Sequence, residues 1–332
     1  MTARPLVIAH RGASGYHPEH TLGAYELAIQ LGSDAIEPDL VVSKDGVLII
    51  RHENEISGTT NVAEKPEFAD RMTTKVVDGE ELTGWFTEDF TWAELSTLMC
   101  RERLPELRPA NREHDDKHGI LRFIDLLEIA DETPGGLSLV VEIKHPTYFA
   151  GLGFSFEALL TQDLFLAGWR TDDPRLIIES FEKSIMVRLR ELGIGSQHFY
   201  IMDNLHTAFD ELVWARSEGV PSISNNDELS DAGLEAFSGR LDGLALASSL
   251  LFDGTEEELM NGQAIVQKAH DLGLKIFTWT LRPENEFLPP MFRTAEGPGS
   301  RGNWQDFYEM IWKLGVDGAF ADHPDLAVRT RP

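Results

Sequence analysis

The chain has 332 residues, a formal net charge of -27, 42% hydrophobic and 26% charged residues, a composition typical of a globular protein. The negative charge argues against binding to nucleic acid or to an anionic membrane surface, and no apolar run approaches the ~20 residues of a membrane span. Cys100 is the single cysteine, so an intramolecular disulfide is excluded.

Short apolar segments alternate with helical segments along most of the chain. The predicted strands are Leu6–Ala9, Ala35–Val42, Val47–Arg51, Ser138–Ile143, Leu176–Glu179, Phe199–Met202, Gly243–Ala247, Lys275–Trp279 and Gly318–Ala321. The clearest predicted helices are Phe156–Leu166, Ser184–Leu192 and Ala264–Leu272. Several strands are continuously apolar, which is typical of parallel strands covered by helices. This alternation predicts a TIM-type (β/α)8 barrel, in which at least one of the nine strands is a hairpin arm or is wrong.

Two irregular segments interrupt the alternation. Residues 53–119 are polar, contain Pro66, Pro105 and Pro109, and end in a charged run. Residues 283–302 contain Pro289-Pro290 and resemble a long loop. Barrel enzymes build their sites from loops at the carboxyl ends of the strands. We therefore predict one catalytic domain, residues 1–332, with residues 53–119 as an insertion over that end of the barrel.

His10 and Arg11 directly follow the first predicted strand, and Gly12 and Gly15 come shortly after. Histidine is an acid/base group, arginine is a fork for anions, and glycines let a ligand approach the backbone closely. An isolated His-Arg pair is more often a surface feature, so this motif alone assigns no function.

Glu37 and Asp39 lie two residues apart in the second predicted strand, so their carboxylates project from the same face. Two like charges on a buried face need a compensating cation, and carboxylate oxygens suit Mg²⁺, Ca²⁺ or Mn²⁺ better than zinc. The alternative is that both face solvent, or that one pairs with a lysine.

A hairpin is predicted after Asp39, because Asp45-Gly46 is a favoured two-residue turn. Pairing Lys44 with Val47 places Asp39 opposite His52, on the same face of the hairpin. This register predicts a second histidine beside the carboxylate pair, and a slip of one residue would remove that pairing.

Later strands also end in polar side chains. Glu142 and Lys144 are two residues apart at the end of one strand, and either face the barrel mouth together or form a simple salt bridge. Glu179 ends the next strand, and Asp322 follows the last. Trp279, near the end of a late strand, is either a core residue or an aromatic wall for a glycerol or alkyl group.

These patterns bring two histidines, three carboxylates, an arginine and a lysine to the carboxyl ends of predicted strands. A bound cation, the arginine and the lysine would neutralise a phosphodiester and the charge that develops on it. The two histidines would supply a base and an acid on opposite sides of phosphorus.

The order of these motifs resembles the glycerophosphodiester phosphodiesterase family over nearly the whole chain. The matching segments are His10-Arg11-Gly12-Ala13-Ser14-Gly15, Pro18-Glu19-His20-Thr21-Leu22, Glu37-x-Asp39-Leu40, Lys44-Asp45-Gly46, Arg51-His52, Glu142-Ile143-Lys144 and Asp322-x-Pro324-Asp325. The Glu19-His20-Thr21 form and the segment 58–63 are most similar to the bacterial periplasmic-type subgroup, whereas many other members have asparagine at the position of His20.

The resemblance implies a phosphatidylinositol-phosphodiesterase-like barrel that hydrolyses glycerophosphodiesters, such as glycerophosphocholine or glycerophosphoethanolamine, to sn-glycerol 3-phosphate and an alcohol. It implies one divalent metal ion, with Ca²⁺ favoured and Mg²⁺ the alternative. In this resemblance His10 and His52 are the implied acid/base pair. Arg11 and Lys144 are the implied phosphate ligands. The implied metal ligands are Glu37, Asp39 and Glu142.

The reaction that the resemblance implies begins with attack of the glycerol 2-hydroxyl on phosphorus, and water then opens the cyclic phosphate. His52 is favoured as the first base and His10 as the acid, although the sequence leaves this assignment open.

Two other functions stay open. A lysophospholipase D or sphingomyelinase D-like enzyme on the same barrel would need an apolar trench and an interfacial surface. A non-catalytic barrel that only binds phosphodiesters would be signalled by loss of a histidine or a metal carboxylate, and all are present.

We expect a small-molecule substrate, no nucleic-acid partner and no stable membrane association, and leave the oligomeric state open. The start of the chain has no room for a signal peptide. This predicts a cytoplasmic protein, or an exported one whose leader is absent from this chain.

Overall fold

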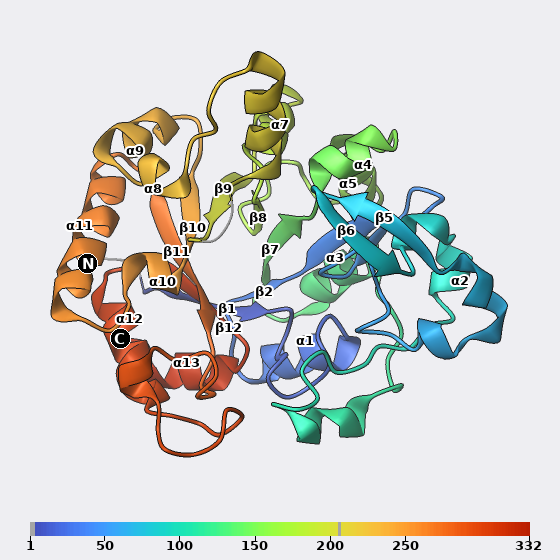
Figure 1. The fold of residues 1–332 in the computed structure, drawn as a ribbon, viewed down its shortest axis with the longest axis horizontal. Helices are drawn as coiled ribbons and strands as arrows, with labels where there is room; N and C mark the ends of the chain where they lie inside the picture. Colours follow the sequence, from blue (N-terminus) through green and yellow to red (C-terminus); the bar gives the residue numbers. More distant parts are fainter. Residues whose placement is uncertain (1–3, 205–206) are drawn as a thin grey trace.

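A closed barrel of parallel strands forms the centre of the computed structural model, which describes residues 4–204 and 207–332 (Figure 1). The barrel strands are β1 (Leu6–His10), β2 (Ala35–Glu37) continued by β3 (Asp39–Val42), β7 (Ser138–Ile143), β8 (Leu176–Ser180), β9 (Gln197–Met202), β10 (Gly243–Ala247), β11 (Lys275–Leu281) and β12 (Gly318–Ala321). Each pairs with the next in parallel, and β2 closes the ring by pairing with both β1 and β7. The predicted (β/α)8 barrel is confirmed.

Pro38 divides the second predicted strand into β2 and β3. Proline has no backbone N–H to donate to a neighbouring strand, but its carbonyl oxygen accepts a hydrogen bond of 2.9 Å from the backbone N–H of Glu142. The two pieces therefore occupy one position in the barrel and both pair with β7.

The extra predicted strand, Val47–Arg51, is not a barrel strand. It forms a hairpin arm, β4 (Leu48–Ile50), which is antiparallel to β3. The predicted register is wrong by one residue, because Leu40 lies opposite Ile50 and Arg51 donates its backbone N–H to the carbonyl of Asp39. The turn holds three residues rather than two, with Gly46 last at a φ of 77°. Glycine takes this left-handed conformation without steric cost, so His52 is not the cross-strand partner of Asp39.

Helices surround the strands and form the outer layer (Figure 1). The longer ones are α1 (Leu22–Gln30), α3 (Phe123–Glu132), α5 (Phe156–Leu166), α6 (Lys183–Glu191), α7 (Phe209–Glu218), α11 (Glu256–Asp271) and α12 (Trp304–Lys313), and the short α13 (Pro324–Thr330) follows β12. The shorter ones are α4 (Pro146–Gly151), α8 (Asn225–Glu228), α9 (Asp231–Phe237) and α10 (Ser248–Leu251). No helix among the described residues is both long enough and apolar enough to cross a membrane.

Side chains of alternate strand residues fill two separate cores, as the period of two in a strand requires. One core fills the barrel, where the rings of Phe199 and Phe277 stack with centroids 4.4 Å apart beside Ile8 and Phe320. The larger core lies between the strands and the helices. The filled interior closes the barrel below the carboxyl ends of the strands, so a ligand can enter only from the loops above them.

Residues 53–119 contain short elements in place of the strand–helix alternation. These are η1 (Val62–Glu64), η2 (Pro66–Arg71), the hairpin of β5 (Thr73–Val77) and β6 (Glu80–Gly84), η3 (Thr87–Asp89), α2 (Trp92–Leu95) and η4 (Pro109–His114). Pro66 and Pro109 begin η2 and η4, where the missing N–H costs nothing. Residues 283–302 are irregular except for η5 (Pro290–Phe292).

Candidate active site

A cavity of about 820 Å³ opens at the carboxyl ends of the barrel strands. Seven of the eight predicted site residues line it: His10, Arg11, Glu37, His52, Glu142, Lys144 and Trp279. The eighth, Asp39, has only 1% of its surface exposed and contacts Arg11 and Lys144 from behind. The structure therefore brings together all eight residues, from His10 near the start of the chain to Trp279 in β11.

His10 is the last residue of β1, and its Nδ1 lies 2.7 Å from Oδ1 of Asp322, which follows β12. Burial and the charge of Arg11 lower the pKa of His10 to about 4. Although burial opposes ionisation, Arg282 and Arg108 hold the pKa of Asp322 well below its usual range. An ionised Asp322 must accept the proton of Nδ1, which leaves a lone pair on Nε2 of a neutral imidazole.

His52 is oriented in the same way by the residue that follows it. Its Nδ1 forms a short hydrogen bond with Oε1 of Glu53, and Arg103 from residues 53–119 donates to the same oxygen over 2.8 Å. Burial, Arg11 and Lys144 lower the pKa of His52 to about 3. Both histidines therefore enter the cavity neutral at pH 7, each with Nε2 free for a proton.

Three buried carboxylates face one another in the same cavity. One oxygen each of Glu37, Glu142 and Glu179 lies within 4.8 Å of the other two. Burial raises the pKa of Glu142 to about 8 despite the opposing effect of Lys144. Burial and the neighbouring carboxylates also raise the pKa of Glu37 and of Glu179 well above the ordinary range.

These carboxylates fit a divalent cation. Oε2 of Glu179 is buried and has no hydrogen-bond partner among the described residues, and such an orphaned acceptor is costly unless a cation compensates it. Hard divalent ions prefer carboxylate oxygens. Glu179 was not among the predicted ligands, yet it ends the strand after Glu142 and is paired with it directly in the register of β7 and β8. The sequence signal for Glu179 is that it and Glu142 lie near the carboxyl ends of two consecutive strands, β8 and β7.

Asp39 is bound by cations and by a histidine. Its Oδ2 accepts a hydrogen bond of 2.8 Å from Nε2 of His20 and lies 3.4 Å from Nε of Arg11, and its Oδ1 lies 3.2 Å from Nζ of Lys144. Burial opposes ionisation, but Lys144, the hydrogen bond from His20 and Arg11 hold the pKa of Asp39 well below its usual range. Asp39 is thus the ionised neighbour of the three carboxylates, and its role as a metal ligand stays a prediction.

Arg11 and Lys144 place two cations at the cavity wall. The backbone N–H of Arg11 donates to Oε2 of Glu37 over 2.8 Å, and its side chain donates to Glu19 over 3.1 Å. Nζ of Lys144 lies 2.6 Å from Oε1 of Glu142. Both alternatives considered for this pair therefore hold, because the two side chains form a salt bridge and also line the cavity.

Trp279 combines the two alternatives considered for it. Its Nε1 donates to the carbonyl of Ala245 over 3.1 Å, and its ring packs edge-on against Phe181 at 5.7 Å. The half-buried ring also lines the cavity. Trp279 is part of the upper barrel core and of the cavity wall at once.

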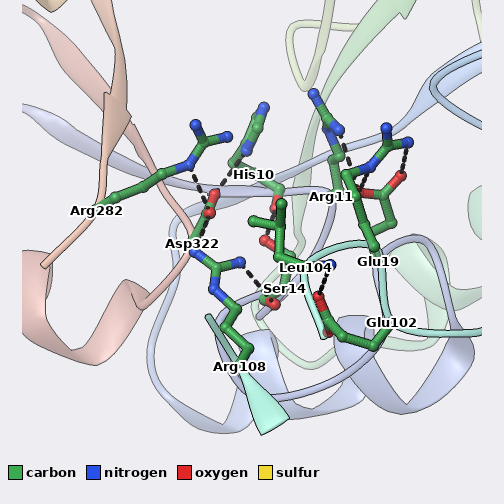
Figure 2. Close-up of a pocket in the computed structure, with 10 residues that line it drawn as sticks. His10, Arg11, Ser14, Glu19, Glu102, Leu104, Arg108, Arg282 and Asp322 are labelled. Atoms are coloured by element: carbon green, nitrogen blue, oxygen red, sulfur yellow. Dashed lines mark hydrogen bonds and ion pairs between the residues drawn. The ribbon is translucent and has the colours of Figure 1, made fainter. Parts of the chain in front are cut away.

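A small polar cavity adjoins the larger one and shares His10 and Arg11 with it (Figure 2). Arg108 crosses it from residues 53–119, donating to Glu284 and to Asp322 over 2.7 Å each. Arg282, directly after β11, donates to Asp322 over 2.8 Å. No sequence pattern predicts these contacts, because they join segments 40 to 214 residues apart.

Comparison with known proteins agrees with this geometry. The sequence matches the model of the glycerophosphoryl diester phosphodiesterase family over residues 10–326. The chain belongs to this family. The Arabidopsis thaliana glycerophosphodiester phosphodiesterase GDPD6 is 30% identical over 334 residues, which cover 97% of this chain and 84% of the relative. The resemblance inferred from the motifs is confirmed, and with it the prediction of a phosphodiesterase.

Solved structures of other family members share the fold. A glycerophosphoryl diester phosphodiesterase from Silicibacter pomeroyi superposes with a TM-score of 0.68 at 20% identity, covering 99% of this chain and 94% of the other. An Oleispira antarctica phosphodiesterase, solved with the product sn-glycerol-3-phosphate, superposes with a TM-score of 0.60 at 21% identity, covering 98% and 96%. Membership of the periplasmic-type subgroup stays a prediction.

Proposed function

We propose that this family member hydrolyses glycerophosphodiesters to sn-glycerol 3-phosphate and an alcohol. The observation that carries the proposal is the shared cavity, where two neutral histidines, Arg11 and Lys144 surround a cluster of three carboxylates. A base, an acid and several positive charges are what displacement at a phosphodiester needs. The product bound to the Oleispira antarctica relative favours the same reaction.

One divalent cation is part of the proposal, with Ca²⁺ favoured and Mg²⁺ the alternative. Glu37, Glu142 and Glu179 would hold it, and Asp39 would contribute charge or a further oxygen. When bound, such an ion supplies positive charge that stabilises the phosphoryl oxygens as negative charge develops on them.

The side chains of the protein perform the proton transfers. His52 is the proposed base: its Nε2 takes the proton of the glycerol 2-hydroxyl as the oxygen–phosphorus bond forms. His10 is the proposed acid and donates a proton to the departing alcohol oxygen as the bond from that oxygen to phosphorus breaks, which leaves a cyclic phosphate. Water then adds to phosphorus, giving a proton to His10, and the bond from the glycerol 2-oxygen to phosphorus breaks as that oxygen takes a proton from His52, which releases glycerol 3-phosphate. For this His10 must hold a second proton, which the ionised Asp322 and the negative charge of the bound phosphodiester favour. Arg11 and Lys144 hold the phosphoryl oxygens.

Residues 53–119 are proposed to cover the carboxyl end of the barrel within one catalytic domain. Two arginines of the segment contact residues of the site: Arg103 binds Glu53, the partner of His52, and Arg108 binds Asp322, the partner of His10. The segment would therefore orient both histidines.

The reaction is tested with glycerophosphocholine and with an analogue that lacks the glycerol 2-hydroxyl, followed by phosphorus NMR. We expect glycerophosphocholine to give glycerol 3-phosphate and choline, and the analogue to be stable. Phosphocholine as the product would contradict the proposed bond cleavage. Hydrolysis of both compounds at similar rates would contradict attack by the 2-hydroxyl.

A lysophospholipid substrate is a second candidate, favoured by the apolar part of the cavity. Val77, Leu82 and Phe209 line it, as does Leu212 of α7. A chain of CH₂ groups would gain about 0.8 kcal/mol for each group buried there. A higher kcat/KM for lysophosphatidylcholine than for glycerophosphocholine would favour this candidate.

A further inference from the structure

Arg282 stands beside His10 at the carboxyl end of the barrel. It directly follows the last residue of β11, and its Nε donates to Oδ2 of Asp322 over 2.8 Å. The other oxygen of the same carboxylate is 2.7 Å from Nδ1 of His10. The two side chains are therefore neighbours on one carboxylate, and Figure 2 shows the guanidinium of Arg282 on one side of the imidazole and that of Arg11 on the other.

The two terminal nitrogens of Arg282 are its distinguishing feature. Among the described residues they make no hydrogen bond and no ion pair, whereas Nε makes both. The side chain is 25% exposed, and its guanidinium packs 4.6 Å from the ring centroid of Phe287. Figure 2 shows these nitrogens pointing in the same direction as the ring of His10, away from Arg108.

The other cationic side chains near His10 are more fully engaged by protein acceptors than Arg282 is. Arg108 binds the same Asp322 oxygen, but its three nitrogens all donate to protein acceptors, namely Glu284, Asp322 and the carbonyl of Ser14. Lys144 contacts two carboxylates, as does Arg11. Arg282 therefore presents N–H donors that no protein group uses, next to the proposed acid.

We infer that Arg282 is a further substrate-binding residue, whose terminal N–H groups donate to the oxygens of the phosphodiester on the side of His10. The inference rests on the proposed function. A guanidinium can bind two phosphate oxygens through two parallel N–H groups held in one plane, a geometry that a lysine does not offer. The contact strengthens as negative charge accumulates on the phosphoryl oxygens, so Arg282 would lower the barrier as well as bind the ground state.

Binding of sn-glycerol 3-phosphate, measured by calorimetry, tests this contact without turnover. We expect Arg282→Gln to raise the Kd about 10- to 100-fold, a typical cost of losing a charge-assisted pair, and Arg282→Lys to have an intermediate Kd. Arg108→Gln is the matched control, because it removes the other cation from the same Asp322 oxygen; we expect it to keep the wild-type Kd.

A purely structural role through Asp322 predicts a different pattern. Because Arg282 contributes to lowering the pKa of His10, its loss would then shift the pH profile of kcat upwards and leave the Kd unchanged. An unchanged Kd for Arg282→Gln, or equal rises for Arg282→Gln and Arg108→Gln, would overturn the inference. A wild-type protein that binds glycerol 3-phosphate through Arg282 but does not hydrolyse glycerophosphocholine would overturn the proposed function alone.

Discussion

Replacing His52 with alanine is expected to lower kcat for glycerophosphocholine by about 10²–10⁴-fold, the usual contribution of a general acid or base. The fold should survive, because the His52 side chain is 28% exposed and its partner Glu53 keeps its ion pair with Arg103. Steady-state kinetics and thermal unfolding of the same preparation separate the two effects.

His10→Ala is expected to lose a similar factor, since Asp322 keeps Arg108 and Arg282 as partners and the fold is retained. A substrate with a p-nitrophenol leaving group distinguishes the two histidines. That leaving group departs without a proton, so the variant that lacks the acid should recover most of its activity. We expect recovery in His10→Ala and none in His52→Ala. The opposite pattern would exchange the two roles, and near-normal turnover of both variants would refute the acid/base pair.

Replacing Glu179 with glutamine is expected to stabilise the metal-free protein at pH 8 and to weaken Ca²⁺ binding at least about tenfold. Glu179 is 2% exposed and faces the carboxylates of Glu37 and Glu142. Without a bound cation the three carboxylates repel one another. With a cation present, the same three carboxylates bind it. Glu80→Gln is the control, because it removes the same charge from an exposed position on the same cavity.

The charges of the three facing carboxylates make the stability of the metal-free protein depend on pH. Burial raises the pKa of Glu142 in the folded state to about 8, above its value in the unfolded chain. Its contribution to stability is complete below the unfolded pKa and is lost as the pH rises to about 8. Because the buried histidines contribute to both proteins alike, the metal-free wild type should lose more stability between pH 5.5 and pH 8 than Glu179→Gln does, since the variant has one fewer of these facing carboxylates.

Ca²⁺ requires ionised ligands, so its stabilising effect should be larger at pH 8. It should reach about 2.7 kcal/mol at a free concentration of 100 times Kd. Equal stabilisation of Glu179→Gln and the wild type by Ca²⁺ would place the ion elsewhere.

The sequence predicted the barrel and most of its site for one physical reason. Side chains at the carboxyl ends of parallel strands meet at one end of a barrel, wherever they stand in the chain. His10, Glu37 and Glu142 each end an apolar run, so their convergence in one cavity followed from local patterns alone. Glu179 obeys the same rule, because it lies near the end of β8 and pairs in register with Glu142 of β7.

Two kinds of information were beyond the sequence. The length of the hairpin turn depends on the left-handed conformation of Gly46, which a two-residue and a three-residue turn both permit, and the register was wrong for that reason. The contacts of Asp322 with Arg108 and Arg282 depend on how residues 53–119 and the loop after β11 fold over the barrel. No periodic pattern reports such long-range contacts.

We propose that this member of the glycerophosphoryl diester phosphodiesterase family needs a divalent metal ion to hydrolyse glycerophosphodiesters. The most direct test of this proposal is the release of glycerol 3-phosphate from glycerophosphocholine by chelator-stripped protein, with Ca²⁺, Mg²⁺ or Mn²⁺ added back singly. We predict no release without metal and full release with one of these ions, Ca²⁺ first among them. Undiminished release by the stripped protein would contradict the metal requirement, and no release with any ion from folded protein would contradict the proposed reaction.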